Sequence, residues 1–120
     1  MTDRRSDDRI PDEIPALFVK EIGDPDIRPA RVRNLSGGGA CAHAETAPPV
    51  GSELYVGFFL QGFGGLPVIA RMRVAWTRPE GEGHLVGLAF HADGPAQRVS
   101  VERMRDYIAA RRRELLGVPV

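Results

Sequence analysis

The stretch Asn34-Leu35-Ser36-Gly37-Gly38-Gly39 places a side-chain amide, a hydroxyl and three glycines in one short loop. Residues without a Cβ leave backbone N–H groups accessible and let a ligand approach them closely. A two-residue hairpin turn needs only one or two such residues, as in Asn-Gly or Gly-Gly. The loop therefore predicts either a binding surface or a plain glycine-rich turn, and its residues alone leave both open.

A second group of polar side chains lies near the N-terminus, where Arg4, Arg5 and Arg9 alternate with aspartates. Residues 1–12 hold too little apolar surface to be ordered by burial, so we expect a flexible arm. In an extended chain Arg5 and Arg9 would lie on one side, roughly 13 Å apart at ~3.3 Å per residue. That spacing suits the gripping of two parts of one ligand, and a solvated, self-neutralising tail is the alternative.

Residues that commonly carry catalysis are present but lack the necessary spacing. His43, His84 and His91 do not show metal-ligand spacing, and Cys41 is alone, which excludes an intramolecular disulfide and a cysteine zinc cluster. Ser36 is not in a G-x-S-x-G elbow, and no lysine follows the glycines as in a nucleotide-hydrolysing P-loop. We therefore predict no catalytic residue, no metal site and no cofactor, so the protein is expected not to be an enzyme.

Composition and charge are those of an ordinary globular protein of one domain. The 120 residues are 42% apolar and 27% charged, with a formal net charge of zero, which gives no electrostatic case for nucleic acid or membrane binding. No apolar run approaches the ~18 residues of a membrane span, and the N-terminus lacks the apolar segment of a signal peptide. A cytoplasmic location is the expectation.

Six short segments alternate apolar and polar residues and are separated by glycine and proline. They cover residues 16–21, 30–33, 40–44, 53–60, 68–76 and 85–90. This pattern predicts an all-β fold, a six-stranded antiparallel sheet that closes into a β-barrel. Within 68–76 the alternation places Trp76 in phase with Val68 and Val74, which favours a core position for Trp76.

The C-terminal segment changes to helical periodicity. Val101, Met104, Ile108 and Leu115 fall on one face, Pro95 suits a helix start, and a glycine and a proline follow. We expect this C-terminal helix to pack its apolar face on the barrel. The predicted division of the single domain 1–120 is a flexible arginine arm at 1–12, a β-barrel at 13–92 and a C-terminal α-helix at 95–116.

The arm and the glycine loop together resemble the PilZ domain, the bacterial receptor module for cyclic di-GMP. The family pattern is R-x-x-x-R followed by [DN]-x-S-x-x-G, and it is complete here as Arg5 and Arg9, then Asn34, Ser36 and Gly39. Segments 74–76 and 87–90 are similar to the family's last two barrel strands. Pro11 and Pro15 between the arm and the first strand are a departure from many relatives and leave the geometry of the arm open.

The resemblance implies a role for each motif residue. The arm would wrap over a cyclic di-GMP held on the barrel, where arginine can bind phosphate or guanine. Asn34 would bond a guanine edge, Ser36 would support a polar contact, and Gly39 would permit close approach. The remaining implied ligand-binding residues are Gly37 and Gly38, which shape the turn, and Arg4, which would help to hold a second ligand molecule. Trp76 is a tentative addition at the border of the site.

The function implied is a cyclic di-GMP receptor or adaptor that orders its arm on binding and signals to an unidentified effector protein. A PilZ-like protein-interaction module that binds no nucleotide is the alternative. Nucleic-acid binding through Arg31, Arg33, Arg71 and Arg73 is a third, and the predicted receptor binds no nucleic acid and does not insert into a membrane. Both a monomer and a homodimer remain open.

Overall fold

Six strands and one helix account for the fold, which the computed structural model describes for residues 13–21, 23, 25–36, 38–60, 65–91 and 94–115. The elements are β1 (Ile14–Val19), β2 (Ile27–Ser36), β3 (Gly39–Ala44), β4 (Glu53–Phe58), β5 (Val68–Glu80), β6 (Gly83–Phe90) and α2 (Gly94–Leu115). Within these ranges, no helix combines the length and the apolar character that crossing a membrane requires.

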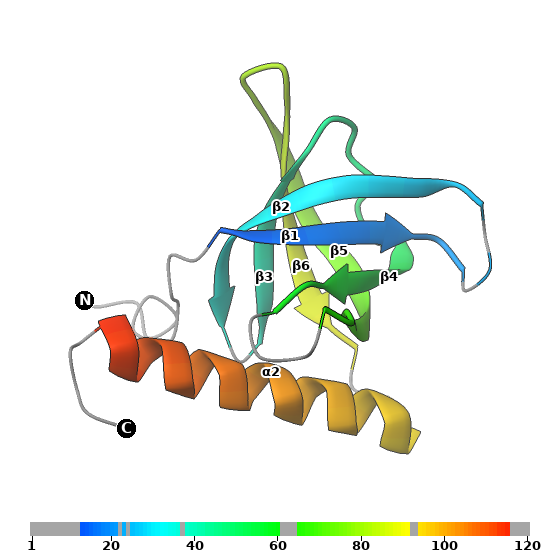
Figure 1. Cartoon of the computed structure of the whole chain (residues 1–120). Helices are drawn as coiled ribbons and strands as arrows, with labels where there is room; N and C mark the ends of the chain where they lie inside the picture. The colour runs from blue at the N-terminus through cyan, green and yellow to red at the C-terminus, as the bar shows by residue number, and fades with distance from the viewer. Residues whose placement is uncertain are drawn as a thin grey trace.

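The strands form a closed barrel in the order β1-β2-β3-β6-β5-β4, and every neighbouring pair is antiparallel. Pairing of β1 with β4 closes the sheet. Helix α2 lies across one end of the barrel, and the hairpin of β5 and β6 projects from the other end (Figure 1). The predicted fold class is therefore confirmed.

The bounds of every strand except β3 differ from the sequence prediction by two or more residues, and turn and proline chemistry explains two of these differences. Strand β1 begins at Ile14 and includes Pro15, because proline is tolerated at the first residues of a strand. Strand β5 continues past Trp76 to Glu80, and only Gly81 and Glu82 separate it from β6. Gly81 has a φ of 60°, so it supplies the positive φ that a two-residue hairpin needs at its first central position.

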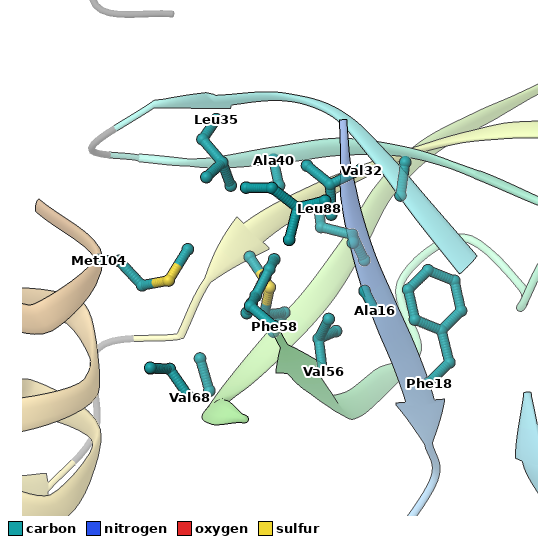
Figure 2. Close-up of a cluster of buried hydrophobic side chains, with 14 of the residues drawn as sticks. Ala16, Phe18, Val32, Leu35, Ala40, Val56, Phe58, Val68, Leu88 and Met104 are labelled. Carbon is teal, nitrogen blue, oxygen red and sulfur yellow. The ribbon is translucent and has the colours of Figure 1, made fainter. Parts of the chain in front are cut away.

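The inward-facing side chains of all six strands fill the barrel. Each strand contributes a residue that is at most 2% exposed: Ala16, Val32, Ala42, Val56, Ala70 and Val86. From α2, Met104 reaches towards the barrel interior between Leu35 and Val68 (Figure 2). Met104 and Ile108 are buried as the helical pattern predicted, and the Leu115 side chain lies outside the described residues.

Gln97 fixes the start of α2 to the barrel. Its side-chain oxygen accepts a hydrogen bond from the Arg71 backbone N–H at 2.8 Å, and its side-chain nitrogen donates to the Arg71 carbonyl at 2.8 Å. The amide group of Gln97 thereby bonds to the β5 backbone as a residue of a neighbouring strand would. Since Gln97 is only 8% exposed, these two bonds satisfy groups that water reaches poorly.

The Arg71 side chain extends this junction to β4. Its guanidinium pairs with the Glu53 carboxylate and lies 5.7 Å from the centroid of the Tyr55 ring. Glu53 also lies 3.4 Å from Nδ1 of His91, which follows β6. One arginine therefore links β4, β5 and the segment that leads into α2.

Replacement of Gln97 by alanine should lower the free energy of unfolding by roughly 2 kcal/mol, because the Arg71 backbone N–H loses its partner and the Arg71 carbonyl keeps only the bond from the His91 backbone N–H. Urea denaturation measures this change. Arg98→Ala is the matched control, since Arg98 is an exposed neighbour on the same helix, and it should stay within about 0.5 kcal/mol of wild type. Equal stability of Gln97→Ala and wild type would contradict the anchoring role.

The hydrogen bond from Arg71 lowers the pKa of the Glu53 carboxyl. A lowered folded-state pKa contributes stability that is present above the unfolded-state pKa of about 4.3 and is lost as the pH falls through the folded-state value. Wild type should therefore lose stability relative to Glu53→Gln as the pH falls below about 4.3. Denaturation of both proteins across this pH range checks the sign, and parallel curves would contradict it.

Candidate functional site

Strands β2, β3, β6 and β5 are consecutive neighbours in the barrel (Figure 1). Residues of these four strands line a pocket. Its volume is about 220 Å³. The lining residues are Asn34, Ser36, Gly38, Gly39, Ala40, Cys41, Ala75, Trp76, Gly87, Leu88 and Ala89. All four described residues of the predicted loop site therefore line one pocket together with Trp76.

The strand register explains how the pocket is built. One cross-strand row runs from Asn34 through Cys41 and Gly87 to Trp76. A second row, one step along the strands, runs from Ser36 through Gly39 and Ala89 to Arg73. Because neighbouring strands lie ~4.8 Å apart, each row spans about 14 Å from β2 to β5.

The two central strands contribute only small residues to these rows. Cys41 and Gly39 come from β3, and Gly87 and Ala89 come from β6. Larger side chains stand only at the outer strands. The result is a floor of backbone and small side chains between a polar wall on β2 and a wall on β5 that contains Trp76.

Trp76 does not lie in the core, so the prediction from alternation is wrong. The pairing of β5 with β6 shifts register between Val74 and Trp76, which marks a β-bulge at Ala75. An extra residue in one strand reverses the phase of every residue beyond it. Val74 accordingly faces inward with 1% exposure, whereas Trp76 faces outward with 39% exposure.

The indole of Trp76 lies on the backbone of Gly87, its cross-strand partner. A Cβ built at Gly87 would lie 2.2 Å from both Cε2 and Nε1 of the indole, so any other residue at 87 would displace the ring. The glycine thus fixes the height of the indole above the floor. An aromatic ring held in this way is a platform for a planar base.

The polar wall on β2 consists of Asn34 and Ser36, which are both half-buried. The Ser36 hydroxyl donates to the Gly39 carbonyl at 3.4 Å, which ties the two ends of the β2–β3 connection together. The side-chain amide of Asn34 has no hydrogen-bond partner among the described residues. Its donor and acceptor are therefore available to a ligand in the pocket.

Gly39 is required by the barrel itself. A Cβ at this position would lie 1.9 Å from the carbonyl oxygen of Leu88 on β6, and the φ of Gly39 is not positive. The absence of a side chain at Gly39 therefore allows the neighbouring strand β6 to approach β3 closely. A Cβ at Gly38 would meet nothing within 4 Å.

Four predicted site residues lie outside the described residues, so their contribution to the site stays a prediction: Arg4, Arg5, Arg9 and Gly37.

Two of the strand arginines that were considered for nucleic-acid binding are paired with carboxylates on the barrel. Arg71 pairs with Glu53, and Arg33 lies 3.4 Å from Glu80. Pairing of this kind lowers the charge that such a surface would offer to a nucleic acid.

The structure adds residues that the sequence interpretation did not assign to the site. These are Ala40, Cys41, Ala75, Gly87, Leu88 and Ala89. The sequence holds a signal for two of them. Gly87 and Ala89 alternate with the inward-facing Val86 and Leu88, and they are small where an outward-facing strand residue is usually larger.

A further pocket, of about 380 Å³ around Phe18, Pro48 and Leu54, contains none of the predicted residues. No three His, Cys, Asp or Glu side chains within the described ranges are grouped as metal ligands.

Comparison with protein families decides the relationship that these features suggest. The family model for the PilZ domain matches residues 3–110. The chain belongs to the PilZ domain family. The matched region includes the arginine arm, the pocket and most of α2.

Solved structures of PilZ proteins share the fold of this PilZ domain. The PilZ domain of CeSA from a cellulose-synthesizing bacterium has a TM-score of 0.61 at 24% identity, over 84% of this chain and 97% of that one. The PilZ domain of YcgR from Escherichia coli, solved with c-di-GMP, has a TM-score of 0.59 at 16% identity, over 91% and 94%.

The Bacillus subtilis inhibitor of motility MotI/DgrA has a TM-score of 0.69 at 14% identity, and the match covers 92% of this chain but 52% of that one. This PilZ domain thus spans about half of that protein. A search of curated proteins gives no match. At these identities the structures establish the fold alone.

Gly39→Ala should destabilise the PilZ domain by about 2 kcal/mol or more, because the new methyl group would overlap the Leu88 carbonyl and separate β3 from β6. Gly38→Ala has open space for the methyl group and should change stability by less than about 0.5 kcal/mol. Thermal denaturation of both variants measures the difference. Similar melting temperatures for the two variants would contradict the close approach of the strands.

Proposed function

We propose that this PilZ domain is a receptor for cyclic di-GMP, which binds in the pocket between Asn34 and Trp76. The observation that carries the proposal is the convergence of the motif residues Asn34, Ser36 and Gly39 with an outward-facing indole on one floor of small residues. The ligand offers what this pocket is suited to bind, namely planar bases with hydrogen-bonding edges and two anionic phosphates.

Each wall of the pocket offers a different kind of contact to the ligand. The amide of Asn34 offers a donor and an acceptor to a guanine edge. The indole of Trp76 offers a face for base stacking, which contributes roughly 1–3 kcal/mol per base in other nucleic-acid-binding proteins. The floor has no long side chain that would prevent a ring from lying flat against the backbone.

The phosphates need cations that the floor does not supply, and the R-x-x-x-R segment supplies them in our proposal. Arg5 and Arg9 would close over the ligand from the side opposite the floor, with Arg4 available for a second ligand molecule. Ordering of the segment would present a new surface to an effector protein. The YcgR structures with c-di-GMP support this proposal by showing that a PilZ domain of the same fold holds the ligand.

Arg5→Ala and Arg9→Ala should each weaken cyclic di-GMP binding at least about tenfold, because a charge-assisted contact contributes ~1.5–3 kcal/mol. Isothermal titration calorimetry measures the affinity and the ligand-to-protein ratio. Arg103→Ala, which removes an exposed arginine of α2, is the control and should bind as wild type. Unchanged affinity in either arm variant would remove that arginine from the site.

The choice of ligand separates this function from its alternatives. Wild type should bind cyclic di-GMP and discriminate against GMP and linear pGpG, with Asn34→Ala losing affinity for cyclic di-GMP. A nucleic-acid-binding surface would instead bind single-stranded or duplex nucleic acid with affinity that falls steeply with salt. No binding of cyclic di-GMP to the folded wild type would favour a protein-interaction module.

A further inference from the structure

Arg78 lies two residues beyond Trp76 on β5 and contacts the indole. Its guanidinium carbon is 5.8 Å from the centroid of the Trp76 ring, the geometry of a cation–π contact. Arg78 pairs across the sheet with Leu85 of β6, next to the pair of Gly87 and Trp76. It therefore stands at the edge of the pocket without lining it.

The position of Gly87 defines which face of the indole Arg78 covers. One face of the indole rests on the Gly87 backbone, where a Cβ would lie 2.2 Å from the ring. The guanidinium therefore covers the face that is turned to solvent. This is the face on which a base would stack, so a base and the Arg78 guanidinium compete for it.

Arg78 also carries a charge that no described carboxylate neutralises. The acidic residue two positions further along β5, Glu80, pairs with Arg33 at 3.4 Å. The contact with the indole is exposed, and such a cation–π contact is weaker than a charge-assisted hydrogen bond to phosphate. A ligand that brings both a planar base and a phosphate would therefore gain by moving the guanidinium from the ring to the phosphate.

We propose that Arg78 is a further ligand-binding residue of this site, whose guanidinium gives up the face of Trp76 to a guanine base and binds a phosphate of the same ligand. The inference rests on the proposed function. It adds a phosphate contact from an arginine of β5 to the contacts proposed for the arginines of the arm. It also explains why the indole and an arginine that no described carboxylate neutralises lie side by side on β5.

Trp76 is the only tryptophan in the chain, so intrinsic fluorescence reports directly on this residue. Cyclic di-GMP should quench the fluorescence of wild type as guanine stacks on the indole. Arg78→Ala should shift the emission of the free protein to longer wavelength, because the indole loses its cover. Ligand should still quench this variant, with an affinity lower by about tenfold, which corresponds to ~1.4 kcal/mol.

Arg78→Lys should recover part of the lost affinity, since an ammonium group can bind a phosphate as a point charge. Arg78→Gln provides a second neutral variant that keeps much of the side-chain stem if Arg78→Ala proves less stable. Arg31→Ala is the charge control, because Arg31 is an exposed arginine on β2 at the far side of the same four strands. It should bind almost as wild type.

Each outcome bears on a different claim. Wild-type binding with unchanged affinity in Arg78→Ala overturns the role of Arg78 and leaves the receptor function standing. Equal losses in Arg78→Ala and Arg31→Ala indicate general charge attraction and also overturn it. Failure of wild type to bind cyclic di-GMP overturns both the receptor function and this inference.

Discussion

The close approach of β3 and β6 is the constraint on which the site depends. At Gly39 a Cβ would overlap the Leu88 carbonyl, and at Gly87 it would overlap the Trp76 indole. Gly39 lets β3 and β6 come together, and Gly87 lets the indole of Trp76 lie flat on the backbone of β6. Because both positions lack a side chain, the outer face of the barrel has a smooth floor where a sheet would otherwise present a row of side chains.

The walls of the pocket follow from irregularities in the strands that flank this floor. The bulge at Ala75 turns Trp76 outward, at the cost of one aromatic side chain that regular alternation would have placed in the core. On the opposite side, β2 shifts register between Val32 and Asn34 and brings Asn34 opposite Cys41. Bulges often redirect side chains next to functional sites, and here one bulge on each flank aims a side chain over the floor.

Much of the fold and part of the site could be predicted from the sequence. Period-2 alternation identified all six strands, and the helical period placed Met104 and Ile108 in the core. The motif residues Asn34 and Ser36 lie in one wall of the pocket, and the motif residue Gly39 lies in its floor. The phase of Trp76 could not be predicted, because a bulge depends on how β5 pairs with β6 and leaves no mark in the alternation before it. The extension of β5 past Pro79 was missed for a similar reason, since proline ends a central strand but is accepted where the neighbour β4 no longer pairs.

The proposed binding of a cyclic dinucleotide on the floor between Asn34 and Trp76 can be tested by mapping of amide chemical shifts. Titration of the isotope-labelled protein with cyclic di-GMP should move the backbone signals of Gly38, Gly39, Gly87 and Ala89 and the indole N–H signal of Trp76 most strongly. Signals around Phe18 and Leu54, which line a separate pocket, should move little. Shifts centred on Phe18 and Leu54, or no shifts at all, would contradict binding on this floor.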